Sequence, residues 1–162
     1  LDDRLLDAVK FAIFTSEQQI FGPNFLPVVL ELVLLLIASE TVTNGIRVTV
    51  TSQFSHAEPQ RQRWYFTYMV RIANEGTETV TLVSRHWIIT DGSNKVQEVR
   101  GPGVVGQQPT LAPEQAHEYT SGCQLSTPFG SMRGTYQMKT RDGAEFDAEI
   151  AEFALTEPYT VH

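Results

Sequence analysis

The sequence contains one cysteine, Cys123, in 162 residues. A single cysteine cannot form an intrachain disulfide and supplies too few thiolates for a cysteine-based zinc site, so both are excluded. This cysteine content is typical of a reducing compartment. Cys123 itself is open to two interpretations. It is either a small apolar residue at a strand edge or a nucleophilic or redox-active thiol.

Basic residues are also scarce. Lysine and arginine number 12 against 19 acidic residues, which gives a net charge of −7 and a pI near 5.0. An acidic surface repels phosphate backbones, so we expect no nucleic-acid partner. A local basic patch made by Arg61, Arg63 and Arg71 stays open, although these residues are few and alternate with strand residues.

Signatures of catalysis and of metal binding are missing. The four histidines, His56, His86, His117 and His162, lie on four segments without ligand spacing, and no GxSxG nucleophile motif occurs. We therefore expect a protein that is not an enzyme, with no metal and no cofactor. In the Arg85-His86-Trp87 triplet, we expect Trp87 in the core and His86 on the opposite face. A solvated strand face explains the acidic residues near the C-terminus, which are Asp142, Glu145, Asp147, Glu149 and Glu152.

No apolar run is long enough to cross a membrane. Residues 28–38 are apolar except for Glu31, but a spanning helix needs roughly 20 such residues, so no membrane span is expected. Residues 1–44 are predicted to form a helical extension, with helices over 1–15 and 26–39. The apolar face of the second helix is too wide for a lone surface helix, which predicts burial against the rest of the chain or against another protein. The candidate partner-binding residues are Val29, Leu32, Val33 and Leu36.

From residue 45 onward the pattern changes to strands. Apolar and polar residues alternate over 46–51, 64–73, 80–83, 85–90, 96–99, 117–121, 130–139 and 146–153, and turn signals separate these segments. Asp142-Gly143 predicts a hairpin between the last two. Short strands with frequent turns predict an all-β sandwich or barrel over residues 45–162.

The segment Gly101-Pro102-Gly103-Val104-Val105-Gly106 matches the GxGxxG pattern of phosphate-binding loops. A dinucleotide site needs a helix after the glycines, but Pro109 and Pro113 exclude one, and no lysine follows to make a P-loop. Two interpretations stay open. In one, Gly101 and Gly103 permit positive φ, Gly106 allows close packing, and the two valines anchor the loop. In the other, the loop amides bind a small anion such as pyrophosphate, with Arg100 supplying charge.

Residues 46–162 resemble the ApaG domain family. The matching pieces keep their order along the chain and comprise residues 64–68, 85–90, 99–106, 119–122, 134–138 and 158–162. The resemblance implies a β-sandwich of the immunoglobulin or fibronectin type III kind. Bacterial members are associated with cobalt and magnesium resistance. Eukaryotic members occur in F-box proteins and in a polymerase-delta-interacting protein found partly in mitochondria, which implies protein binding.

The resemblance also implies a pyrophosphate site at Gly101, Gly103 and Gly106, and it transfers no catalytic residue. We expect a protein-interaction module that is an accessory or assembly subunit of a larger complex. The alternatives are a small-anion-binding protein or a role in cobalt or magnesium homeostasis. A start at Leu1 with a helical extension favours a processed plastid or mitochondrial protein. The alternative location is the cytoplasm. The sequence predicts neither the partner nor the oligomeric state.

Overall fold

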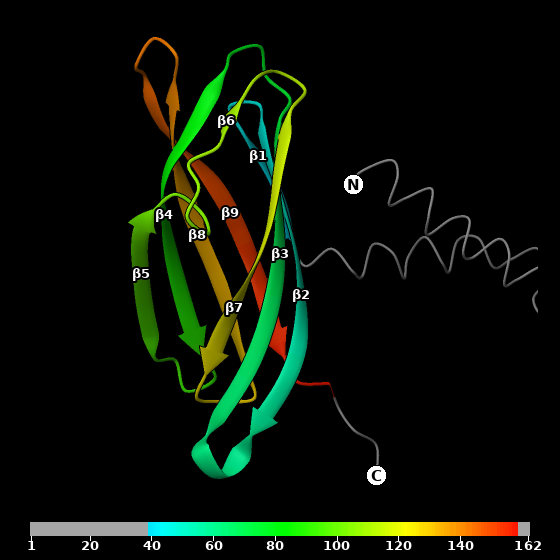
Figure 1. The fold of residues 1–162 in the computed structure, drawn as a ribbon. Coiled ribbons are helices and arrows are strands. Elements are labelled where there is room, and N and C mark those ends of the chain that lie inside the picture. The colour runs from blue at the N-terminus through cyan, green and yellow to red at the C-terminus, as the bar shows by residue number, and fades with distance from the viewer. Residues whose placement is uncertain (1–38, 159–162) are drawn as a thin grey trace, which may run out of the picture. The chain divides into compact units, whose positions relative to one another are not determined.

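The computed structural model describes residues 39–158, which form two antiparallel sheets packed face to face (Figure 1). The first sheet has the order β1 (Ser39–Thr43), β2 (Ile46–Glu58), β3 (Arg63–Asn74) and β7 (Ala116–Leu125). The second has the order β5 (Val96–Pro102), β4 (Val80–Asp91), β8 (Phe129–Thr140) and β9 (Glu145–Thr156), and β6 (Thr110–Leu111) also pairs with β4. A 3-10 turn, η1 (Pro59–Arg61), joins β2 to β3. The predicted β-sandwich is confirmed.

The core lies between the two sheets because each strand turns alternate side chains inward. Its largest fully buried side chains include Tyr136, Phe66 and Phe153. Trp87 is 2% exposed and packs edge-on against Tyr68, with 5.4 Å between the ring centroids. His86 lies on the other face of β4 and contacts Glu98, so the expected placement of Trp87 and His86 is correct.

The predicted boundary at residue 44 is wrong. Ser39–Thr43 is strand β1, paired antiparallel with β2 from Ser39 opposite Val50 to Thr43 opposite Ile46. This strand was not predicted because the Leu-rich, helix-like pattern continues without a break into the polar, β-branched sequence SETVT. The helices predicted over residues 1–38 lie outside the described residues. The hairpin at Asp142-Gly143 is confirmed, with Gly143 in the left-handed region at φ +95°.

The two segments predicted over 80–83 and 85–90 are one strand, β4, with an irregularity between Leu82 and Ser84 in its pairing with β8. The extra residue is Val83, which is 38% exposed. A β-bulge shifts the alternation by one position, so Leu82 and Trp87 both face the core although one number is even and the other odd. Arg85 consequently lies on the inner side of the sheet.

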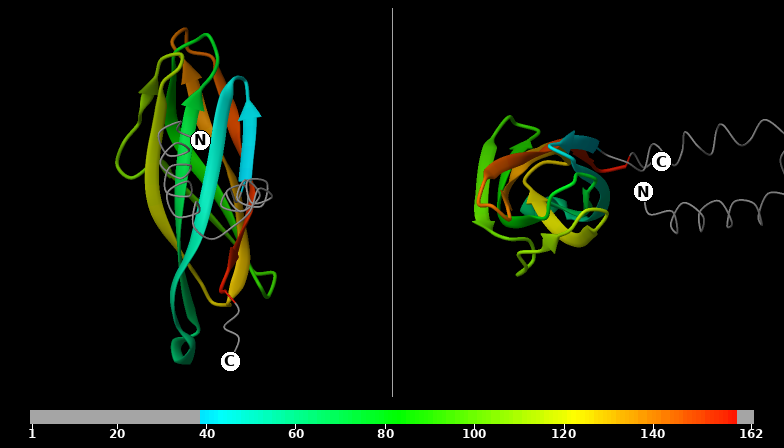
Figure 2. Two further views of the ribbon diagram at one scale, coloured as in Figure 1. Left: turned by 90° about the vertical axis from the view of Figure 1, so that its right-hand side faces the viewer. Right: turned by 90° about the horizontal axis from the view of Figure 1, so that it is seen from above.

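The sandwich is closed along one side and open along the other. On the closed side, the backbone amide of Glu149 in β9 donates to Thr43 Oγ1 (3.1 Å), and Ser52 Oγ donates to the carbonyl of Ala154 (3.0 Å). The view from above in Figure 2 shows β1 beside β9 on this side. On the open side the edge strands are β5 and β7, and no ladder joins them.

Candidate functional site

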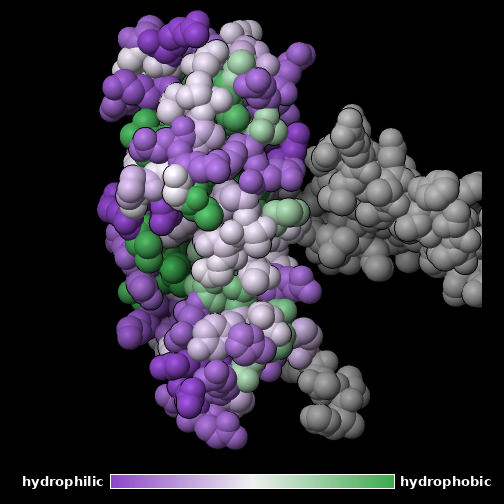
Figure 3. All heavy atoms as spheres, viewed as in Figure 1, coloured by the Kyte–Doolittle hydropathy of each residue, from purple (hydrophilic) through white to green (hydrophobic). Residues whose placement is uncertain are grey.

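A cleft of about 450 Å³ lies on the open side of the sandwich. Apolar residues are visible along this side of the surface between hydrophilic ones (Figure 3). The lining side chains come from both sheets and are Tyr68, Arg85, Trp87, Ile89, Gln97, Val99, Ser121, Cys123, Gln124 and Met132. The bulge in β4 directs Arg85 and Trp87 toward this cleft.

Arg85 supplies the positive charge of the cleft. Besides it, the ionisable side chains among the described lining residues are the phenol of Tyr68 and the thiol of Cys123. Its Nη1 donates to the carbonyl oxygens of Pro102 (3.0 Å) and Gly103 (2.8 Å). Within residues 39–158, Nε and Nη2 have no protein acceptor and Arg85 makes no ion pair. The guanidinium therefore keeps unused donors.

The glycine loop is built around Arg85. A Cβ added at Gly101 would lie 3.2 Å from both Nη1 and Nη2 of Arg85, so the absence of a side chain leaves room for the guanidinium. Gly101 lies within β5 and does not have a positive φ, which corrects the predicted reason for this glycine. Gly103 does have a positive φ, at +54°, and a Cβ there would meet the carbonyl oxygen of Gln107 at 2.0 Å.

Two other predicted roles in the loop are wrong. Gly106 does not allow close packing, because an added Cβ would meet nothing within 4 Å. Its φ of +77° is the feature that favours glycine. Val104 is buried (1% exposed) and anchors the loop, whereas Val105 is 63% exposed and does not. No helix follows the loop. Residues 107–116 instead contain β6 and the start of β7, as the two prolines predicted.

Several amides of the loop already donate to carbonyls of the domain. Gly103 donates to the carbonyl of Val83 (2.9 Å), and Val104 and Gln107 donate to each other's carbonyls (2.7 and 2.9 Å). Hydrogen-bonding direction alternates along a strand, so the β4–β5 register also turns the amide of Gly101 toward Arg85. Arg100 is 68% exposed and lies 3.7 Å from Glu98. Anion binding by Arg100, Gly101, Gly103 and Gly106 stays a prediction, and these contacts give it few free donors.

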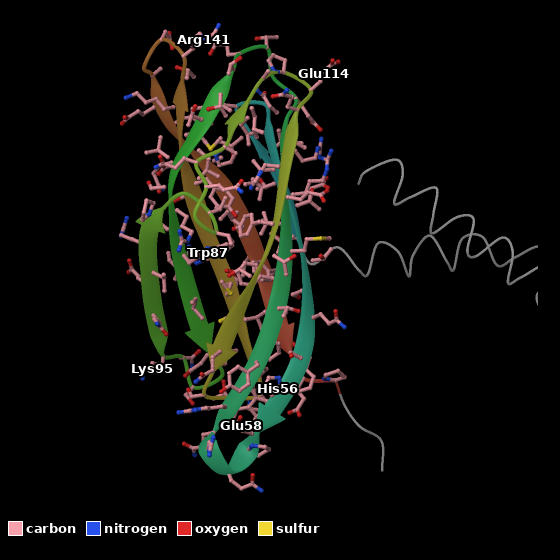
Figure 4. All side chains as sticks on the ribbon, viewed as in Figure 1. His56, Glu58, Trp87, Lys95, Glu114 and Arg141 are labelled. Atoms are coloured by element: carbon pink, nitrogen blue, oxygen red, sulfur yellow. The ribbon has the colours of Figure 1, made fainter. Side chains whose placement is uncertain are left out.

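Trp87 also lines the cleft, and its side chain carries a second unused donor. Its indole Nε1 is buried and has no hydrogen-bond partner within the described part of the chain. Buried donors without partners are rare in native proteins, because their desolvation is not compensated. The other tryptophan differs, since Trp64 Nε1 donates to Glu157 Oε2 at 2.9 Å. Figure 4 places Trp87 inside the sandwich.

The hydroxyl-bearing Tyr68 and the thiol-bearing Cys123 also line the cleft, whereas Tyr119 and Tyr136 belong to the core. Tyr119 and Tyr136 are hydrogen-bonded through their hydroxyl groups, and burial raises the pKa of both. Burial also raises the pKa of Tyr68, which the hydrogen bond with Ser121 partly offsets. Burial raises the pKa of the Cys123 thiol to about 11, so it is protonated at neutral pH, which favours the packing interpretation of this residue over a nucleophile.

The predicted anion-binding residues Arg100, Gly101, Gly103 and Gly106 are not among the described residues that line this cleft. The candidate partner-binding residues Val29, Leu32, Val33 and Leu36 lie outside the described residues. Over residues 39–158 no group of three His, Cys, Asp or Glu side chains could hold a metal ion. Within the same range, none of the helical structure is long and apolar enough to pass through a membrane.

Arg85 is not among the site residues predicted from the sequence, although the sequence contains a signal for it. Core-facing positions fall on even numbers at the buried Val80 and Leu82 and on odd numbers at the buried Trp87 and the partly buried Ile89. A change of parity inside a continuous strand pattern indicates one inserted residue. That insertion turns Arg85 inward, toward the glycine that leaves room for it.

Comparison with known proteins agrees with the fold and with the resemblance. The ApaG domain profile matches residues 54–140. Protein ApaG of Bordetella pertussis is 52% identical over 119 residues, which cover 72% of this chain and 91% of that protein. Protein ApaG of Dechloromonas aromatica is 50% identical over 126 residues, which cover 76% and 99%.

A crystal structure described as the ApaA protein from Bordetella pertussis aligns with a TM-score of 0.68 at 48% identity, covering 76% of this chain and 99% of that one. These relatives are bacterial, and they lend no support to the predicted plastid or mitochondrial location. With half of the aligned residues identical over nearly the full length of these relatives, this chain belongs to the ApaG domain family.

Proposed function

We propose that this chain is a protein-interaction module without catalytic activity, and that it binds an extended segment of a partner along the free edge of β7. The observation that carries the proposal is the open side of the sandwich, where β7 pairs only with β3 among the described strands and borders the cleft. An unpaired strand edge offers backbone donors and acceptors to an added strand, and pockets beside it select side chains.

The register shows which groups of β7 are available. Asn74 N donates to the carbonyl of Gln115, so this pair and every second pair after it along the β3–β7 ladder is hydrogen-bonded. The backbone groups of Glu118, Thr120 and Gly122 therefore point away from β3. The pairing shows no register shift, and the ten-residue strand contains no proline or lysine. Apart from the charge of Glu118, the common devices that protect an edge strand are thus missing from β7.

The other edges of the sandwich are less suited to an added strand. β1 has five residues, and β9 packs beside β1 and β2 on the closed side. β5 has seven residues and ends at Pro102, which has no amide hydrogen to donate. The predicted helix with Val29, Leu32, Val33 and Leu36 stays a second proposed contact, through which the chain would join a larger assembly.

Selection from a random-peptide display library against the full chain tests this proposal. Enriched peptides should bind in extended form and should slow amide hydrogen exchange at Glu118, Thr120 and Gly122, because these amides gain acceptors. Thr120→Pro removes one outward amide without removing a β3–β7 hydrogen bond, so peptide binding should be lost. Thr120→Ala is the matched control, since it keeps the amide and should keep binding.

Two results would contradict the proposal. Enriched peptides could protect another part of the domain while the amides of β7 exchange as before. Alternatively, Thr120→Pro and Thr120→Ala could bind the same peptide equally well although both variants are folded. Either result would show that the free edge of β7 is not the binding surface.

A further inference from the structure

We propose that the cleft beneath the glycine loop binds a carboxylate, held by the guanidinium of Arg85 and the indole N–H of Trp87. This inference deepens the proposed function, because it assigns the acidic group of a bound segment to the pocket beside β7. It rests on the cleft itself and on three donor nitrogens, Arg85 Nε and Nη2 and Trp87 Nε1, that have no acceptor within residues 39–158.

The polar groups of the cleft match an acceptor-rich ligand. Arg85 has Nε and Nη2 free, and these form the planar fork that binds a carboxylate through both of its oxygens. The indole nitrogen of Trp87 can only donate. The side-chain amides of Gln97 and Gln124 and the hydroxyl of Ser121 can donate as well. Between residues 39 and 158, no carboxylate side chain lines the cleft.

The charge of the cleft favours a monoanion over a phosphate. Among the described residues that line the cleft, Arg85 is the only basic one, so it balances one negative charge. A phosphate dianion would keep an uncompensated charge in a partly buried site of a protein whose net charge is −7. The aromatic walls made by Tyr68 and Trp87 exclude part of the solvent, which strengthens the contact between a guanidinium and a carboxylate.

The geometry also explains how the guanidinium of Arg85 keeps one position before a ligand binds. Its Nη1 is fixed by the carbonyls of Pro102 and Gly103, and Gly101 leaves space beside the guanidinium. A side chain that is held before binding loses less rotamer freedom when the ligand arrives. The glycine loop thus acts as the support of Arg85, and its amides need not touch the ligand.

The two tryptophans provide a direct test by NMR on the full chain. The probe is glutamate capped at both ends, and the control is the equally capped glutamine, which has the same shape without the charge. Capped glutamate at millimolar concentration should shift the Trp87 indole N–H signal, because that group gains an acceptor. The Trp64 indole should not move, since it already donates to Glu157. N-Acetylglycine carries a C-terminal carboxylate. Comparing its effect on the Trp87 signal with that of capped glutamate therefore distinguishes binding of a C-terminal carboxylate from binding of a side-chain carboxylate.

Variants give a second readout. Arg85→Gln should weaken binding of capped glutamate by about 30-fold or more, the usual effect of removing one partner from a hydrogen-bonded charge pair. Arg100→Gln makes the same change in net charge on an exposed arginine outside the lining, and it should alter affinity less than about threefold. Trp87→Phe should weaken binding while leaving the charge unchanged.

The proposal is overturned if capped glutamate and capped glutamine shift the same signals equally, or if neither moves the Trp87 indole. It is also overturned if Arg85→Gln and Arg100→Gln weaken binding alike. These outcomes are separable from a failure of the proposed function. Library peptides that protect β7 while capped glutamate leaves Trp87 unmoved would retain the interaction module and remove the carboxylate pocket.

Discussion

Gly103 and Gly106 share a backbone conformation but have different surroundings. Both are in the left-handed region, at φ +54° and +77°. A Cβ at Gly103 would meet the carbonyl oxygen of Gln107 at 2.0 Å, whereas one at Gly106 would meet no atom within 4 Å. Substitutions at the two positions therefore separate the free-energy cost of a left-handed backbone conformation from the cost of a steric clash.

Gly103→Ala is expected to lower the free energy of unfolding by roughly 2–5 kcal/mol, because it adds steric overlap to the strain of a left-handed residue. Gly106→Ala should cost about 1–2 kcal/mol, from the conformation alone. Urea denaturation of both variants measures the difference. Equal losses would mean that the loop relaxes around the new methyl group and does not hold Arg85 in a fixed position.

At the level of elements, the side chain of Asn74 connects the end of β3 with β6 and with the β3–β4 connection. Asn74 is 1% exposed. Its Nδ2 donates to the carbonyls of Glu78 (2.7 Å) and Leu111 (3.0 Å), and its Oδ1 accepts from the amide of Gly76 (3.0 Å). Three backbone groups at this end of the sandwich therefore depend on one side chain.

Asn74→Ala should lower the free energy of unfolding by roughly 3–5 kcal/mol, because partly or fully buried backbone groups lose their partner. Gln115→Ala is the control. Gln115 is exposed and its Oε1 accepts one bond, from Ala112 N (2.9 Å), so its loss should cost less than about 1 kcal/mol. Similar losses in both variants, measured by urea denaturation, would show that water replaces the contacts of Asn74.

Alternation of apolar and polar residues predicted the strands because it reports which side chains reach the core. The same signal failed at Ser39–Thr43, where a Leu-rich run precedes a short strand, and at β4, where the bulge depends on pairing with β8. The glycine pattern predicted a turn but not its purpose. The space at Gly101 is needed by Arg85, which is distant in sequence, and only the β4–β5 register brings the two together.

At the level of the whole sandwich, four weakly acidic side chains, three tyrosines and one cysteine, lie inside or beside the core. Burial raises the pKa of Tyr68, Tyr119 and Tyr136, and raises that of Cys123 from its usual value of 9.0 to about 11. Each of these groups binds its proton more tightly in the folded state than in the unfolded state. Their contribution to stability is complete below pH 9, and it is lost as pH rises through the folded pKa values.

We therefore expect the free energy of unfolding to fall steadily between pH 9 and pH 11. Cys123 accounts for roughly 3 kcal/mol over that span, because a shift of about two pKa units corresponds to that free energy. Urea denaturation at a series of pH values measures the slope. Cys123→Ala removes one titrating group and should make the decline shallower, whatever it does to stability at pH 7. An unchanged slope would mean that Cys123 reaches solvent through the cleft, which would also weaken the desolvation on which carboxylate binding by Arg85 depends.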